Sequence, residues 1–106
     1  MAVEGNPTLG WVVGTGSFTA TGNGAAVPVA RRGDLNISLS GTFVATIVPQ
    51  RSFDGGTTWL PLTYVDGSAI SWTAPMSTPL PEPEAGVQYR LACTYTSGTV
   101  TWRISQ

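Results

Sequence analysis

The sequence predicts an all-β fold: an antiparallel β-sandwich or jelly-roll-like domain of about seven to eight short strands with no substantial helix. Three observations support this class. Runs rich in β-branched and aromatic residues alternate between apolar and polar positions. Glycine, proline, asparagine and aspartate separate these runs at intervals of roughly eight to twelve residues. Thr and Ser fill most of the polar positions, since charged residues make up 10% of the chain.

The amino-terminal third predicts an arm followed by short strands. Residues 1–10 show no periodicity, so we expect an extended arm in front of a single domain at residues 11–106. The next apolar segments, residues 11–13 and 17–21, are one strand interrupted by glycines or two separate strands. A short apolar strand at 26–30 contains Pro28, which lacks a backbone donor and therefore belongs at a sheet edge.

The central third is organised around residues 43–64. Two β-prone runs, 43–48 and 59–64, flank an Asp54-Gly55-Gly56 step, and this pattern predicts a β-hairpin. Before it, residues 35–39 alternate with period two and predict a half-buried strand. After it, residues 69–73 predict one more short strand.

The carboxy-terminal third combines a proline-rich stretch with two regular strands. Residues 75–86 contain four prolines, which predict an unpaired, extended loop. Residues 87–95 and 100–104 alternate regularly, and we expect them to form a second hairpin around Ser97-Gly98. The side chains predicted to fill the core are Leu35, Ile37, Leu39, Phe43, Ile47, Trp72, Val87, Tyr89, Leu91, Val100, Trp102 and Ile104.

Charge and cysteine content exclude several classes of function. Five arginines, balanced by six carboxylates, form no basic stripe, so we expect no nucleic-acid partner. No segment is long and apolar enough to span a bilayer, and the first residues lack the pattern of a signal peptide. Cys93 is the single cysteine, and its alternation with Leu91 and Tyr95 predicts a buried thiol that acts as a small hydrophobe.

Catalytic and metal-binding chemistry has little support in the sequence. The chain has no histidine, so both a catalytic triad and a reactive cysteine would lack their base. Its aspartates stand beside turn glycines, where turn formation is their usual role. Glu82 and Glu84 have the spacing of a carboxylate pair, but we expect them in a solvated loop. We therefore expect no catalytic residue, no metal site and no cofactor.

One motif stands out at the tip of the central hairpin. Ser52, Asp54, Gly56 and Trp59 fit the pattern Ser-x-Asp-x-Gly-x-Thr-Trp, which resembles the Asp-box of sialidases and other propellers. The resemblance implies that Ser52 and Asp54 bond the turn backbone, that Gly56 permits the reversal, and that Trp59 covers the hairpin. A single copy in 106 residues cannot build a propeller, so the motif indicates a hairpin rather than sugar cleavage.

Sugar binding is the alternative to a purely structural role. Four tryptophans and two tyrosines could stack on pyranose rings if several of them lie exposed on one face; otherwise they belong to the core. These residues are Trp11, Trp59, Trp72, Trp102, Tyr64 and Tyr95.

A second resemblance covers roughly residues 40–106. The segments at 50–59 and 86–100 are similar to small virion proteins of tailed bacteriophages, the β-sandwich proteins that coat or cement capsids. The resemblance implies a non-enzymatic protein on the capsid exterior, made in the host cytoplasm without a signal peptide, that cements neighbouring major capsid subunits. It also implies self-association as dimers or trimers; a tail or receptor-binding module is the alternative. The candidate interface residues are Glu4, Asn6, Pro7 and Leu9 in the arm, Arg31 and Arg32, and Pro79, Pro81, Glu82 and Glu84 in the proline-rich loop.

Overall fold

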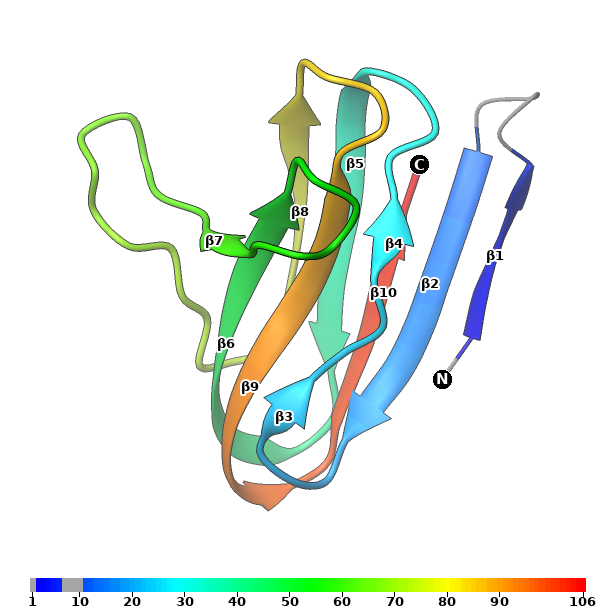
Figure 1. The fold of residues 1–106 in the computed structure, drawn as a ribbon. Helices are drawn as coiled ribbons and strands as arrows, with labels where there is room; N and C mark the ends of the chain where they lie inside the picture. The colour runs from blue at the N-terminus through cyan, green and yellow to red at the C-terminus, as the bar shows by residue number, and fades with distance from the viewer. Residues whose placement is uncertain (1, 7–10) are drawn as a thin grey trace.

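The computed structural model describes residues 2–6 and 11–106 and confirms the predicted all-β sandwich (Figure 1). This part of the chain contains strands and no helix. Two antiparallel sheets pack face to face. The first has the order β1 (Ala2–Asn6), β2 (Trp11–Phe18), β10 (Val100–Ser105), β5 (Gly33–Ser40) and β8 (Met76–Glu82). The second has the order β3 (Gly22–Asn23), β9 (Gln88–Gly98), β6 (Phe43–Ser52) and β7 (Leu60–Pro61), and β4 (Val27–Pro28) also pairs with β9.

The core lies between the two sheets and contains the predicted side chains. All but two of the twelve are buried; Phe43 and Trp72 are partly buried and pack against the others. Exposure alternates along β5 and β9 because successive side chains of a strand point to opposite faces of the sheet. Cys93 is buried, as its alternation predicts. Residues from the amino-terminal half complete the core, namely Val12, Phe18, Val27, Val29 and Ala45.

Residues 76–82 of the proline-rich segment form a strand, so the prediction of an unpaired loop at residues 75–86 is wrong for this part; residues 83–86 form a turn outside the sheet. β8 pairs with β5 from Leu39↔Met76 to Gly33↔Glu82. A strand can accept proline when the missing N–H group faces away from its neighbour, which happens at a sheet edge. β8 is such an edge, and Pro79 and Pro81 are two residues apart, so both missing donors lie on the same side of the strand.

The second predicted hairpin is also wrong. β9 and β10 follow each other in the chain but belong to different sheets, so the connection around Ser97-Gly98 crosses the sandwich. The main partner of β9 is β6, which it pairs with from Phe43↔Gly98 to Ser52↔Gln88. Alternation indicates which face of each strand is buried. It does not indicate which strand lies beside it, because both arrangements bury the same side chains.

The central hairpin is confirmed, with a short second arm. β6 and β7 pair at Gln50↔Pro61 and Arg51↔Leu60. Beyond β7 the chain leaves the sheet and projects from the sandwich as an irregular excursion (Figure 1). The strand predicted at residues 69–73 is reduced to two isolated bridges, Thr63↔Ala69 and Ile47↔Trp72.

The described part of the predicted arm is folded into the first sheet. Residues 2–6 form β1, which pairs with β2 from Ala2↔Thr15 to Asn6↔Trp11. Glu4 and Asn6 therefore lie in an edge strand rather than in a free arm, and Pro7 and Leu9 lie outside the described residues. The segment after them is one continuous strand, β2, despite its glycines.

Glycine in β2 makes room for an aromatic ring. Gly16 lies opposite Trp102 in the sheet, and a Cβ atom at Gly16 would stand 2.9 Å from the indole. Such a separation is shorter than carbon atoms tolerate, so only glycine lets the ring lie flat across the neighbouring strand. Pro28 occupies β4 at an edge of the second sheet, as predicted.

Candidate functional site

The loop between β6 and β7 carries the Asp-box-like motif, and hydrogen bonds to the Asp54 carboxylate hold it in shape. Asp54 Oδ1 accepts hydrogen bonds from the backbone N–H groups of Thr58 (2.9 Å) and Thr57 (3.1 Å) and from Ser52 Oγ (2.8 Å). These donors, the Thr58 N–H above all, stabilise the carboxylate and lower the pKa of Asp54 to about 2. Asp54 therefore organises the turn in its ionised form.

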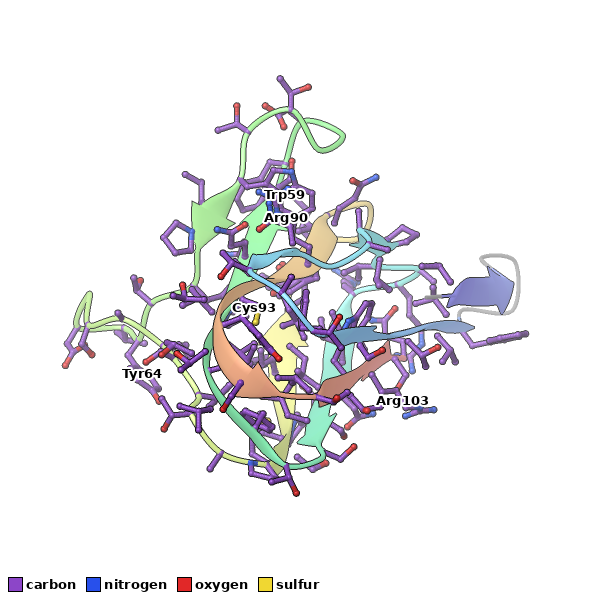
Figure 2. All side chains as sticks on the ribbon, turned by 90° about the horizontal axis from the view of Figure 1, so that it is seen from below. Trp59, Tyr64, Arg90, Cys93 and Arg103 are labelled. Carbon is purple, nitrogen blue, oxygen red and sulfur yellow. The ribbon has the colours of Figure 1, made fainter. Side chains whose placement is uncertain are left out.

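The other motif residues complete the same turn. Ser52 is buried, and its Oγ accepts a hydrogen bond from the Gly56 N–H at 2.9 Å. Gly56 has a φ of +96°, a backbone conformation that favours glycine. Trp59 Nε1 donates to the Gly56 carbonyl at 3.0 Å, and the Arg90 guanidinium lies 4.3 Å above the Trp59 ring centre (Figure 2). All four motif residues thus bond or cover the turn itself.

A buried ion pair lies next to this hairpin. Arg51 on β6 binds Glu82 on β8 through Nη2 and Oε1, and the side chain of Glu82 is fully buried. Tyr89 on β9 donates its hydroxyl to the same carboxylate oxygen at 2.9 Å, while Oε2 accepts the Glu84 N–H at 3.1 Å. Burial, followed by the neighbouring Glu82 carboxylate, raises the pKa of Tyr89. Arg51, Glu82 and Tyr89 together connect the two sheets through charged hydrogen bonds.

This geometry corrects the prediction for Glu82. The solvated loop expected there is instead the buried end of β8, and the carboxylate is fully engaged by neighbours in the same chain. Glu82 therefore cannot serve as a free contact residue, and it cannot form a solvent-facing carboxylate pair with the exposed Glu84. Neighbouring strands contribute Arg51 and Tyr89, so no local sequence pattern around Glu82 could reveal the site.

A groove of about 460 Å³ opens between the β7 excursion and β8, with the ion pair at one side. Four apolar side chains on it are strongly exposed: Phe53 at 54%, Leu60 at 49%, Tyr64 at 58% and Val65 at 110%. We call these four residues the apolar rim. Arg51 lies 4.7 Å from the Phe53 ring centre and so links the rim to the ion pair. Further lining comes from Pro61, Leu62, Ile70, Leu80, Pro81, Pro83 and Tyr89.

The sequence contained a signal for the apolar rim that a search for alternating apolar and polar residues does not detect. Residues 59–65 read Trp-Leu-Pro-Leu-Thr-Tyr-Val, in which apolar residues stand at both odd and even positions. A strand with one buried face cannot hide both sets. The segment therefore leaves the sheet, and Tyr64 lies on the excursion outside the sandwich (Figure 2).

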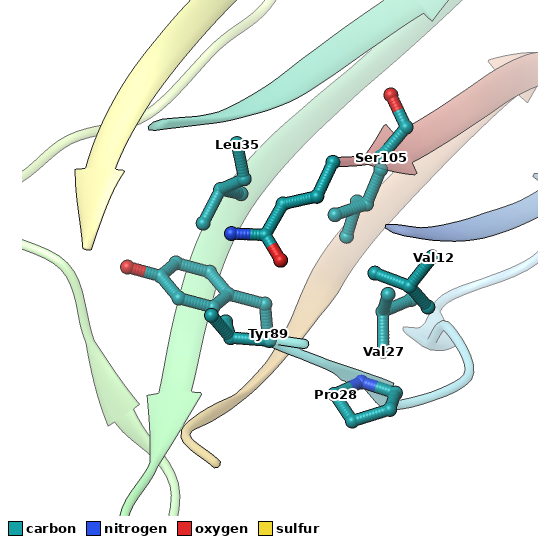
Figure 3. A pocket seen from close by; sticks show the side chains of 9 residues that line it. Val12, Val27, Pro28, Leu35, Tyr89 and Ser105 are labelled. Atoms are coloured by element: carbon teal, nitrogen blue, oxygen red, sulfur yellow. The ribbon is translucent and has the colours of Figure 1, made fainter. Parts of the chain in front are cut away.

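A second cavity lies between the two sheets of the sandwich (Figure 3). It is lined by Val12, Val27, Leu35 and Tyr89, and its volume of about 10 Å³ admits at most one water molecule. Gln106 closes it: its Oε1 accepts the Ala30 N–H at 2.9 Å, and its Nε2 donates to the Arg31 carbonyl at 2.6 Å. This cavity is a packing feature.

The predicted interface residues do not converge on one surface. Glu4 and Asn6 lie in β1 at one edge of the first sheet, and Pro79 is exposed in β8 at the other edge. Arg31 and Arg32 are exposed on the turn before β5, and Glu84 is exposed beyond β8. The structure does bring Arg32, Pro81 and Glu82 together around one shallow depression, which Pro83 also lines.

The tryptophans are mostly withdrawn from solvent. Trp102 is buried, Trp72 packs against the core, and Arg90 covers one face of Trp59. Trp11 is 40% exposed. Of the two tyrosines in the predicted stacking set, Tyr64 is 58% exposed and Tyr95 is partly buried against the core, so the six residues do not form one exposed aromatic face.

Comparison with known proteins gives no relative from which a function could be transferred. No protein-family model matches the chain, and searches of curated proteins and of solved structures find no match either. Within residues 2–6 and 11–106, no three His, Cys, Asp or Glu side chains are placed to share a metal ion. The same residues include no helix long and apolar enough to cross a membrane.

Proposed function

We propose that the chain is a non-enzymatic structural protein of a phage virion, which binds the outer surface of the capsid and cements neighbouring capsid subunits. The apolar rim carries this proposal. Four of the seven large apolar side chains that are exposed among the described residues gather around one groove; the other three, Val3, Trp11 and Val44, lie outside it. Exposed apolar surface of this kind marks interaction sites, contacts with other proteins among them.

The size of the rim fits a contact that is repeated many times. Aromatic side chains present about 150–250 Å² each, so Phe53 and Tyr64 together leave roughly 200 Å² in water. Burying that area gains about 5 kcal/mol before the cost of association is subtracted, which is a weak contact on its own. A cement protein uses weak contacts well, because a copy that bridges two subunits binds the second one at high effective concentration.

The rim is held in place before any partner binds. Phe53 belongs to the turn that Asp54 organises. Tyr64 begins a tight turn, in which its N–H donates to the Ser68 carbonyl at 2.8 Å and its carbonyl accepts from Gly67 at 2.9 Å. Contact residues on bonded turns lose little conformational entropy on binding, so more of the interaction energy remains as affinity.

Two alternatives differ from this proposal in measurable ways. A carbohydrate-binding module has less support, because Trp102 is buried and Arg90 covers Trp59. A tail or receptor-binding component would use the same kind of apolar contact at a different place in the virion. Copy number separates these cases, since a coat protein is present in hundreds of copies per particle and a tail part in a handful.

The test is the stoichiometric binding of the purified chain to capsid shells that lack it. We expect saturable binding in a fixed ratio to the major capsid protein, and a loss of at least about tenfold in affinity for the double variant Tyr64→Ser, Val65→Asp. The matched control is Val44→Asp, since Val44 is equally apolar, 59% exposed and outside the groove. Absence of binding to shells, or equal loss in the Val44 control, would refute the proposal.

A further inference from the structure

Three of the strands at the sheet edges contain proline, and β1 does not. Proline occurs in β8 at positions 79 and 81, in β4 at position 28 and in β7 at position 61. The remaining edge strand of the second sheet, β3, has only two residues. Among the described residues, β1 is thus the one edge strand longer than two residues that carries no proline. Edge strands of this kind can accept another strand.

The hydrogen-bond pattern shows which backbone groups of β1 are free for this. The Val12 carbonyl accepts a hydrogen bond from the Gln106 N–H at 2.9 Å, so the backbone groups of Val12 face β10. In an antiparallel sheet, the N–H and C=O of one residue point to the same side, and successive residues alternate. Gly5, which lies opposite Val12, therefore points its N–H and C=O away from β2, and so does Val3.

The same alternation accounts for the opposite edge of this sheet. When the same alternation is followed from β2 across β10 to β5, the N–H and C=O groups of Asn36 point toward β10. Pro79 lies opposite Asn36, so its nitrogen, and that of Pro81, faces away from the sheet. Two of the three outward-facing positions of β8 are therefore prolines, Ser77 being the third, and β8 offers a poor edge for pairing.

We propose that β1 is a strand-addition site for β1 of a second copy of this chain, with the two strands antiparallel about a two-fold axis. This pairing joins two five-stranded sheets into one continuous sheet. In the register with full overlap, Val3 of each copy lies opposite Gly5 of the other, and each such pair exchanges two N–H···O=C bonds.

Because β8 is a poor partner for an added strand, β1 is left to pair with β1 of a second copy, and the assembly stops at two chains. Pairing β1 of one copy with β8 of the next would repeat without limit, and Pro79 and Pro81 disfavour it by removing two of the three outward donors of β8. Pairing β1 with β1 uses the open edge of both copies at once, so no further edge remains. The net charge of −1 opposes this association only weakly, whereas the full-overlap register places Glu4 opposite Glu4 of the second copy, and this like-charge pair lowers the affinity of the dimer.

This inference specifies the self-association that accompanies the proposed function, and it is tested on the isolated chain without capsid shells. Light scattering after size exclusion should show a reversible dimer with a dissociation constant in the roughly micromolar to millimolar range, because the paired strands are short. Val3→Pro removes an outward donor and should weaken the dimer at least about tenfold. The matched control Val3→Thr keeps the donor and the β-branched side chain, and should leave the constant within about threefold.

Two further measurements keep the inference testable if Val3→Pro perturbs folding. Amide hydrogen exchange on the native chain should slow at Val3 and Gly5 as concentration rises, whereas the Glu4 amide, which faces β2, should not change. The double variant Pro79→Thr, Pro81→Thr restores the blocked donors and should form oligomers larger than two.

A chain that stays monomeric up to about 1 mM, or a dimer that Val3→Pro leaves intact, overturns the inference. The outcome is separate from that of the capsid experiment. The rim variant Tyr64→Ser, Val65→Asp should lose capsid binding and keep the dimer, because the apolar rim does not include β1.

Discussion

Replacing Arg51 with Met tests the contribution of the buried ion pair to stability. The substitution keeps an apolar stem of similar length and removes the cation, which leaves the fully buried Glu82 carboxylate with two donors, the Tyr89 hydroxyl and the Glu84 N–H. The lost charge-assisted hydrogen bond is worth about 1.5–3 kcal/mol. Loss of the guanidinium over the Phe53 ring adds about 0.5–1 kcal/mol. Because the Arg51 side chain is 29% exposed, the expected total of about 2–4 kcal/mol lies below the 3–5 kcal/mol typical of a wholly buried pair.

The assay is urea unfolding at pH 7, followed by tryptophan fluorescence, for Arg51→Met, Glu82→Gln and the double variant. Glu82→Gln keeps an oxygen acceptor and removes the charge, so it should cost about 1–2 kcal/mol in the presence of Arg51. In the double variant it should cost nothing further, because a neutral amide replaces a carboxylate that has lost its cation. Additive losses, or a loss below about 0.5 kcal/mol for Arg51→Met, would show that the pair does not couple the sheets.

Three further predictions concern the core, the cavity and the hairpin. Gly16→Ala forces a methyl group into the ring of Trp102 and should cost about 1–3 kcal/mol of unfolding free energy, whereas the control Gly22→Ala enters open space and should cost little. Gln106→Ala removes the hydrogen bonds that close the small cavity, and a loss of about 1–3 kcal/mol in the same assay is expected; a change near zero would contradict the closing role. Because the pKa of Asp54, about 2, lies below the ordinary 3.8, its bonds stabilise the hairpin above about pH 4 and are lost as pH falls toward 2. Carboxyl NMR shifts should show that titration, and a midpoint at or above 3.8 would exclude the bonded turn.

The alternation of apolar and polar residues in the sequence was sufficient to predict the class of fold and most of the core. Leu35, Ile37 and Leu39 are buried, and so are Tyr89 and Leu91, because alternation decides which face of a strand is apolar. The turn motif was equally predictable. Its bonds run between residues at most four positions apart, so local sequence contains all the partners.

Strand neighbours could not be predicted in the same way. β9 and β10 have the right pattern for a hairpin, but each pairs with strands from distant parts of the chain. The prolines in β8 argued against any strand until the sheet order placed them at an edge with their nitrogens outward. Whether a strand lies at the edge or in the centre of a sheet depends on all the strands of that sheet, so no local segment of the sequence shows it.

The candidate site likewise has some features that local sequence predicts and others that depend on the tertiary structure. The sequence by itself determined a sandwich, its buried alternating positions and a rigid Asp54 turn, because these depend on the period of a strand and on bonds between near neighbours. Only the tertiary structure decided that Glu82 is buried against Arg51, that Phe53 and Tyr64 share a groove, and that β1 keeps an open edge. Those features arise where segments far apart in the chain meet, and their free energy comes from long-range pairing that the local pattern leaves open.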